Sequence, residues 1–194
     1  DEAIRAALGM EETTYQEAIR QLCQQQILIY RSSRGIYAFK NNVGLDIEKE
    51  IAIHDYLVDN INYVDTGDSS YNAYSALING IAVCSGYTEC FKTLLDMLGI
   101  ENATISGEAG GQQHIWNVVN LDNHWYHVDV TWDDPVGSSS DYIDHSYFNI
   151  SADDMALDHT WDRSRYSAYE KCGAKYSYCR YKKLPLISNV NQLN

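Results

Sequence analysis

The chain has 194 residues, and its 14 Lys and Arg against 27 Asp and Glu give a formal net charge of −13. This length suffices to bury one hydrophobic core, whereas the acidity argues against nucleic acid and anionic membrane surfaces, which bind clustered Lys and Arg. No apolar run approaches the ~20 residues of a membrane span. The chain opens on Asp1 without a signal-peptide pattern, so we expect any targeting segment to lie upstream.

The five cysteines are too sparse for a disulfide framework, and they form no Cys-x-x-Cys pair. No histidine stands near a cysteine at zinc-finger spacing, so we expect neither a metal nor another cofactor. Each cysteine is then either a small buried apolar residue or a reactive thiol, and the second needs an electropositive setting with a base nearby.

The first 42 residues are expected to form a supporting subdomain, ahead of a catalytic domain at 43–194. Residues 1–26 are rich in Ala, Glu, Gln and Ile and predict two short helices broken near Gly9. Residues 27–31 and 35–39 are β-prone runs on either side of a short polar turn, which predicts a hairpin.

A helix is predicted from Asp46 onward, since apolar residues recur there at helical spacing. His54 lies on that apolar stripe and is interpreted as a hydrogen-bonded core residue with no further role. A turn-rich loop over 65–72 and a helical turn over 71–78 follow.

Cys84 stands at the start of the next predicted helix, from about Ser85 to Leu98. The apolar face of this helix repeats every three to four residues, and Gly99 fits the position just after a helix end. The positive end of the helix dipole favours a thiolate, and such settings lower a cysteine pKa to about 3.5–7.5. Free N–H groups there also suit an oxyanion.

Residues 114–121 and 124–131 are β-prone and flank Asp122 and Asn123, which predicts a hairpin with a two-residue loop. In that register paired residue numbers sum to 245, so His114 and Asp129 share a face as diagonal neighbours. Asp129 would then orient His114, and His114 would serve a Cys84 thiolate as general base and acid. Whether His114 and Asp129 lie on the same face of the hairpin therefore depends on the length of the loop.

The other histidines are weaker candidates for the base. His127 shares the face but lies further along its strand, and His124 falls in the turn. His145 and His159 have no comparable strand pattern around them. The glycine-rich segment at 107–113, just before His114, is either a mobile loop that gates access or an ordinary strand connection.

Three blocks of sequence carry a resemblance to the bacterial transglutaminase-like superfamily. They occur in the family's order and cover about Ile47 to Trp161, with 147–148 and 159–161 looking like its C-terminal elements. The blocks are Asn-Gly-Ile-Ala-Val-Cys-Ser-Gly-Tyr at 79–87, His-Ile-Trp-Asn-Val at 114–118 and Trp-Tyr-His-Val-Asp-Val-Thr-Trp-Asp-Asp-Pro at 125–135.

The resemblance implies an α+β, papain-like fold in which the cysteine helix packs on an antiparallel sheet that carries the other two residues. It implies Cys84 as nucleophile, His114 as base and Asp129 as orienter, the same three that the residue patterns select. The sequence departs from the family at Ile115, where a small residue is common. The oxyanion donor is open: the Cys84 backbone N–H is the default, with Tyr74 and Asn79 as side-chain candidates.

This chemistry is acyl transfer on a peptide or protein amide through a thioester, with hydrolysis placed ahead of crosslinking to an amine. The high tyrosine content suits a peptide or glycan groove, and a cell-wall peptide is one candidate substrate. We expect neutral or basic substrates and an extracellular or cell-surface location in preference to the cytoplasm. The competing hypothesis is a binding or scaffold module of a larger surface protein that uses the fold without turnover.

Overall fold

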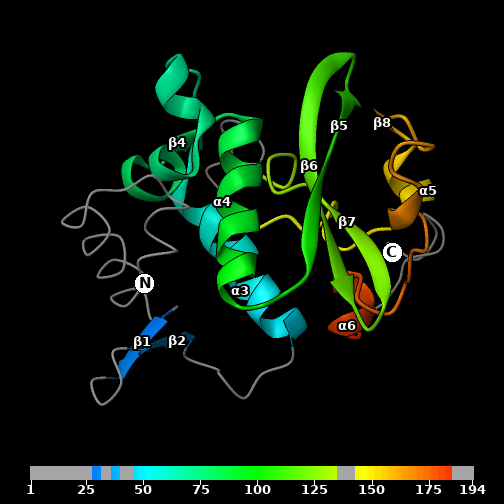
Figure 1. The fold of residues 1–194 in the computed structure, drawn as a ribbon, viewed down its shortest axis with the longest axis horizontal. Helices are drawn as coiled ribbons and strands as arrows, with labels where there is room; N and C mark the ends of the chain where they lie inside the picture. Colours follow the sequence, from blue (N-terminus) through cyan, green and yellow to red (C-terminus); the bar gives the residue numbers. More distant parts are fainter. Residues whose placement is uncertain (1–27, 32–35, 40–45, 135–142, 185–194) are drawn as a thin grey trace, which may run out of the picture.

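The computed structural model describes residues 28–31, 36–39, 46–134 and 143–184 (Figure 1). The two helices predicted within residues 1–26 lie outside these ranges. Strands β1 (Leu28–Arg31) and β2 (Ile36–Phe39) pair antiparallel, which confirms the first predicted hairpin. The predicted domain boundary at residues 42 and 43 also lies outside the described residues and stays a prediction.

A four-stranded antiparallel sheet forms the centre of the molecule, with strand order β7-β6-β5-β8. Its long strands form a meander, and β8 returns from the C-terminal part of the chain to the free edge of β5. The strands are β5 (Asn102–Ala109), β6 (Gln112–Leu121), β7 (His124–Val128) and β8 (His159–Thr160).

The glycine-rich segment before His114 is a strand connection. Gly107 lies within β5, and Gly110 and Gly111 make the two-residue turn into β6 at φ of 56° and 78°. A turn with positive φ at both central positions matches the twist of paired strands, and glycine adopts it without strain. The ordered hairpin therefore favours the strand connection over the gating loop.

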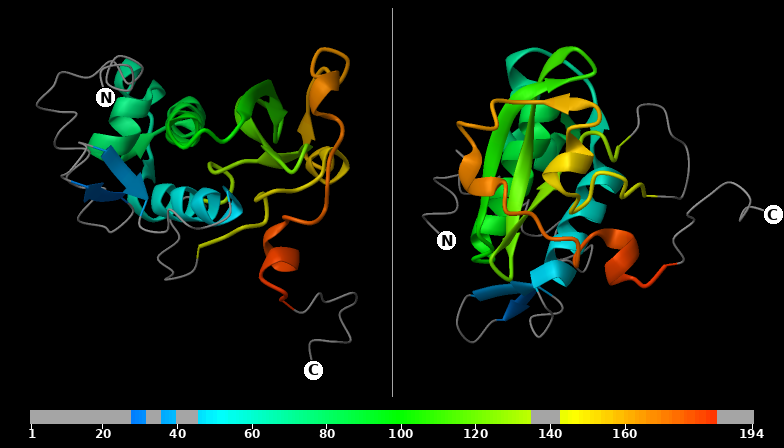
Figure 2. Two further views of the ribbon diagram at one scale, coloured as in Figure 1. Left: turned by 60° about the horizontal axis from the view of Figure 1, so that its bottom comes forward. Right: turned by 90° about the vertical axis from the view of Figure 1, so that its right-hand side faces the viewer.

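Two helices cover one face of the sheet. Helix α4 (Cys84–Met97) packs on β6 and β5, and α3 (Asp46–Asn60) packs on α4. The start of α3 and both ends of α4 lie within one residue of their predicted positions, and Gly99 lies just past α4 at a φ of 71°. Figure 2 shows the sheet standing between these helices and the segment that contains α5 (Ala152–Met155).

Short elements connect these layers. Between α3 and α4 the chain forms the parallel strands β3 (Asn62–Tyr63) and β4 (Ile81–Ala82), a 3-10 turn at Asp68–Tyr71 and a π-helical turn at Ser75–Asn79. These turns fall in the predicted loop and helical turn. Toward the C-terminus lie the 3-10 turn Ser167–Tyr169 and α6 (Tyr178–Tyr181).

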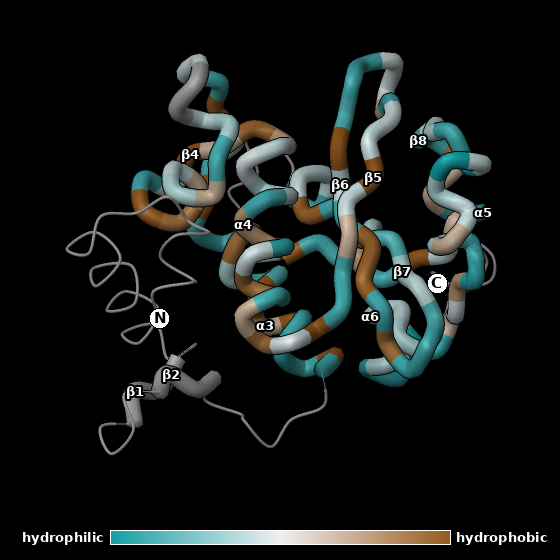
Figure 3. The backbone as a smooth tube through the Cα atoms, in the orientation of Figure 1, coloured by the Kyte–Doolittle hydropathy of each residue, from teal (hydrophilic) through white to brown (hydrophobic). Residues whose placement is uncertain are grey.

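The core divides between the two faces of the sheet because side chains alternate along each strand. Val119 and Leu121 of β6 pack with the apolar faces of α3 and α4. Trp116 and Val118 point the other way and pack with Met155. Figure 3 shows the polar tip of the β5–β6 hairpin beyond this apolar interior. Within the described residues, no helix is long and apolar enough to cross a membrane.

Candidate active site

Cys84 is the first residue of α4. Val83 before it is extended, at φ −107° and ψ −179°, so the chain enters the helix from a strand-like segment. The first N–H groups of a helix have no intrahelical acceptor, and the helix dipole places positive charge there. Cys84 is half-buried and lines a surface cavity, so a substrate can reach its thiol. Its neighbour in sequence, Cys90, is fully buried as a core residue.

The hairpin of β6 and β7 has the register that the two-residue loop predicts. Leu121 pairs with His124 and Asn117 with Val128, and Asp122 and Asn123 take φ of 53° and 60° in the turn. The pairing ends at Val128, three residues short of the predicted strand end, so Asp129 lies just past β7.

His114 and Asp129 are in direct contact, as the hairpin register predicts. His114 Nε2 lies 2.6 Å from Asp129 Oδ2. Asn117 lies on the opposite face of β6, where its amide donates to the Thr88 carbonyl at 3.1 Å and ties the sheet to α4. Asn117 therefore has a structural role on the face of β6 that is turned away from His114.

The Asp129 carboxylate is only 1% exposed and accepts four hydrogen bonds. Oδ2 faces His114 and also His159 Nε2 at 3.0 Å, and Oδ1 accepts the backbone N–H groups of Thr131 and Trp132 at 3.1 and 3.2 Å. Burial alone would raise the pKa of this carboxyl, but the two histidines outweigh it and the pKa is lowered. Asp129 is therefore a fixed negative charge beside His114.

His114 has a pKa raised to about 9. Burial alone would lower it, but hydrogen bonds with Asp129 and with the Cys84 side chain, and the charges of both, stabilise the protonated ring. Because Nε2 is bound to Asp129, Nδ1 is the nitrogen left to exchange a proton with the thiol. The arrangement can hold a thiolate next to an imidazolium, the form that an activated cysteine nucleophile needs.

His159 is a member of this network that the sequence did not reveal. It is fully buried on β8, where it pairs with Ala109, and its two ring nitrogens face Asp129 and Asp158. The two-residue strand that carries it is too short for a periodic pattern, so nothing in the sequence pointed to its contact with Asp129. His127, the competing base, is buried against Trp116, and burial lowers its pKa to about 3, so it stays neutral.

The cavity beside Cys84 has a volume of about 390 Å³. The β5–β6 hairpin tip forms one wall and the turn after β7 forms another. Tyr74 and Asn79 do not line it; Asn79 is exposed and its amide contacts the Ser75 hydroxyl at 3.3 Å. The lining residues are Tyr63, Cys84, Ala109, Gly110, Gln112, Gln113, His114, Thr131, Trp132 and Asp134.

Tyr63 and Thr131 are the two side chains in this lining that carry a hydroxyl. Tyr63 is 40% exposed on β3, and the pKa of its phenol is raised by burial and by the nearby Cys84. Its ring stacks on Tyr87 of α4, whose hydroxyl donates to Asp134. Tyr63 could not be chosen over Tyr74 from the sequence, because β3 meets β4 only in the folded chain.

Among the described residues, His114, Asp129 and His159 also place three donor atoms within 4.8 Å of one another, a spacing that suits a metal ion. Here the shared carboxylate is almost wholly buried and already has four hydrogen bonds. The arrangement is interpreted as a hydrogen-bonded support for His114.

Residues 36–130 match the family model of the transglutaminase-like superfamily, a range that contains Cys84, His114 and Asp129. The match starts within β2, inside the region assigned to the supporting subdomain. A search of curated proteins finds no match.

Three solved structures are similar over about two thirds of this chain. A TGase crystal structure is 16% identical with a TM-score of 0.46, and the match covers 65% of this chain and 33% of that one. A candidate cysteine protease from Cytophaga hutchinsonii is 17% identical with a TM-score of 0.43, covering 68% and 43%. A candidate protease from Parabacteroides distasonis is 10% identical with a TM-score of 0.36, covering 66% and 28%. The chain spans less than half the length of each.

Proposed function

Since the chain belongs to the transglutaminase-like superfamily through residues 36–130, we propose that it catalyses cysteine-dependent acyl transfer on peptide or protein amides. The observation that carries the proposal is the His114 ring held between the Asp129 carboxylate and the Cys84 thiol. A cysteine at a helix start, a base and an orienting carboxylate are the parts that nucleophilic catalysis requires.

In the proposed reaction the Cys84 thiolate attacks the amide carbonyl and forms a carbon–sulfur bond. The oxyanion is stabilised by the Cys84 backbone N–H, and we add the Tyr63 hydroxyl as the second donor. His114 gives its proton to the leaving amine, and the carbon–nitrogen bond breaks to leave a thioester. The same ring then takes a proton from the incoming nucleophile, which attacks the thioester carbonyl. The carbon–sulfur bond breaks and frees the Cys84 thiolate, and Asp129 keeps its charge throughout.

We place hydrolysis ahead of transfer to an amine. Gln112, Gln113 and Gly110 on the cavity wall are exposed, so water has access to a thioester at Cys84. Transfer to an amine needs water to be excluded from the intermediate. A non-catalytic binding module, the competing hypothesis, gains no support from an accessible thiol in contact with a raised-pKa histidine.

The test is incubation with a peptide library that includes glutamine-containing and basic peptides, with and without a primary amine, read by mass spectrometry. Chain cleavage, deamidation and amine incorporation each change the mass differently. We expect cleavage or deamidation that the Cys84→Ala variant lacks. Unchanged masses under both conditions, with a folded wild-type protein, would favour the binding module.

A further inference from the structure

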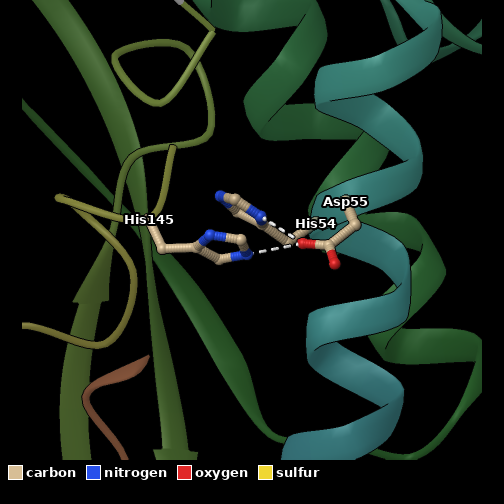
Figure 4. A group of neighbouring side chains, drawn as sticks. All are labelled: His54, Asp55 and His145. Atoms are coloured by element: carbon tan, nitrogen blue, oxygen red, sulfur yellow. Dashed lines mark hydrogen bonds and ion pairs between the residues drawn. The ribbon is translucent and has the colours of Figure 1, made fainter. Parts of the chain in front are cut away.

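A second cluster of ionisable side chains lies away from the Cys84 cavity (Figure 4). His54 and Asp55 are neighbours on α3, and His145 comes from the segment that follows the turn after β7. Asp55 Oδ1 lies 2.7 Å from His145 Nε2 and 3.1 Å from His54 Nδ1. Figure 4 shows both rings pointing at this one carboxylate oxygen.

The remaining nitrogens of both rings also face oxygen acceptors. His54 Nε2 lies 3.0 Å from the buried Asp133 carboxylate, and His145 Nδ1 lies 3.0 Å from the Ile143 carbonyl. A neutral imidazole carries one N–H, so two neutral rings could satisfy only two of these four contacts. Two of the four contacts are therefore left without a hydrogen, and two further positive charges, either as protons or as a bound cation, would satisfy them.

A single divalent cation supplies these charges better than two protons do. Two imidazolium rings would stand with their centroids 4.9 Å apart, inside a cluster whose His54 is fully buried. Like charges at this spacing repel, most strongly where water is excluded. A dication leaves both rings neutral and balances the two carboxylates Asp55 and Asp133.

We propose that His54 Nδ1, Asp55 Oδ1 and His145 Nε2 bind a divalent transition-metal ion, with Zn²⁺ as the ion that best suits these donors. Two imidazoles and a carboxylate are a known ligand set for zinc, and donors ~2.0–2.1 Å from the metal stand about 3.3 Å apart in tetrahedral geometry. All three donor atoms lie within 4.8 Å of one another, so small side-chain shifts close the site.

The surroundings of the rings match those of metal-binding histidines. Such histidines donate their second N–H to a carboxylate or a backbone carbonyl, which fixes the tautomer and the ring orientation. Asp133 is positioned as the acceptor for His54, and the Ile143 carbonyl is positioned as the acceptor for His145. Tyr178 of α6 also stacks on the His145 ring with centroids 3.5 Å apart.

The exposure of the carboxylate separates this cluster from the one around Asp129. A cavity of about 420 Å³ reaches Asp55 and His145, with Asp144, Tyr178 and Leu184 also on its walls. The Asp55 side chain is 33% exposed, against 1% for Asp129. The cavity gives a metal ion a route in and leaves room for water on its remaining coordination positions.

The proposed metal would join α3 to the segment that carries His145. It would also hold Asp133, and with it the turn from Asp129 to Asp134 that forms a wall of the Cys84 cavity. This inference does not rest on the proposed catalytic function, because it concerns different ligands and a different cavity.

The test is titration of the chelator-treated, reduced full chain with Zn²⁺ by calorimetry and with Co²⁺ by absorption spectroscopy. We expect one ion per chain, and cobalt d–d bands of a four- or five-coordinate site without a sulfur charge-transfer band. His145→Gln and Asp55→Asn should each weaken binding by at least about 100-fold, beyond the 10–100-fold typical of losing an outer-shell partner. His114→Ala, a matched histidine variant at the other cluster, should bind as the wild type does.

The proposal is overturned if the wild type binds neither ion at micromolar concentration, so that protons alone occupy the cluster. It is equally overturned if His145→Gln and Asp55→Asn bind with unchanged affinity, or if a sulfur-to-cobalt band places the metal on a cysteine. Circular dichroism of each variant without metal identifies variants that do not fold. If these variants do not fold, the cobalt spectrum of the wild-type protein still decides whether a metal binds and whether sulfur is a ligand.

Discussion

Asp129 accepts hydrogen bonds from two histidine side chains and two backbone N–H groups, with almost no access to water. The two histidines keep the carboxylate ionised in spite of its burial, and its charge in turn keeps His114 protonated. At the residue scale, the proposed chemistry therefore depends on one carboxylate held in place from four directions.

Replacement of this carboxylate should change both the rate and its pH dependence. His114 must be protonated to release the leaving amine, and with its pKa at about 9 the wild-type kcat/KM should fall as the pH rises through that value. In Asp129→Asn the supporting charge is lost, so the basic limb of the pH profile, where kcat/KM falls at high pH, should move down toward pH 6.5, the ordinary histidine pKa. The rate itself should drop by roughly 10²–10⁴-fold.

The control for this pH profile is Glu108→Gln. Glu108 is an exposed carboxylate on β5, in the β5–β6 hairpin that also carries His114. Its side chain accepts a hydrogen bond from Gln113. Its variant should keep a basic limb near 9. A limb that stays near 9 in Asp129→Asn would show that this carboxylate does not set the protonation of the base.

At the scale of elements, the edge strand β8 places His159 against Asp129. Gly107 of β5 lies directly under β8: a Cβ at this position would lie 2.1 Å from the Thr160 carbonyl oxygen and 3.0 Å from the Trp116 ring. Both neighbours are parts of the fold with little freedom to move. Gly107 therefore allows β8 to approach closely enough for His159 to reach Asp129.

Gly107→Ala should displace β8 and lower the free energy of unfolding by about 1–3 kcal/mol, the usual cost of overpacking. Because His159 moves with the strand, the variant should also lose activity while still folded. Denaturant unfolding and kcat/KM measure the two effects. Ser106→Ala, an exposed neighbour on β5, is the control and should leave both unchanged; a neutral Gly107→Ala would contradict the close packing of β8.

The sequence predicted the elements whose patterns are long or whose turns are distinctive. The periodic faces of α3 and α4 and the Asp122–Asn123 turn were sufficient to place Cys84, His114 and Asp129. Strand β5 was missed because Gly107 and the polar residues around it suggested a loop. The pairing with β6 outweighs that local preference, since tertiary context dominates strand propensity.

The contacts of His159, Tyr63 and the His54–Asp55–His145 cluster could not be predicted from sequence. His54 and His145 are 91 positions apart and meet only because the chain returns from the sheet to α3. The expectation that His54 is a hydrogen-bonded core residue agrees with its burial, but the pattern of one helix cannot show which residues bind it.

At the scale of the whole molecule, the net charge of −13 should affect substrate association. Long-range attraction of a basic peptide is screened by salt, with a Debye length of about 10 Å at 0.1 M. The KM for a lysine-containing peptide should therefore rise with ionic strength, while a peptide with glutamine in place of lysine should show little change. Equal salt dependence of the two peptides would mean that the overall charge does not select substrates.

The most direct test of an activated Cys84–His114 pair is the rate at which each cysteine reacts with a thiol-directed alkylating probe, resolved by mass spectrometry of peptides. The chain provides its own controls, since it has four other cysteines, of which Cys90 is fully buried and Cys179 is exposed. We predict that Cys84 reacts faster than the other four, including the exposed Cys179, and that His114→Ala abolishes this preference. Equal labelling of the accessible cysteines, or a Cys84 preference that survives in His114→Ala, would contradict an activated Cys84–His114 pair.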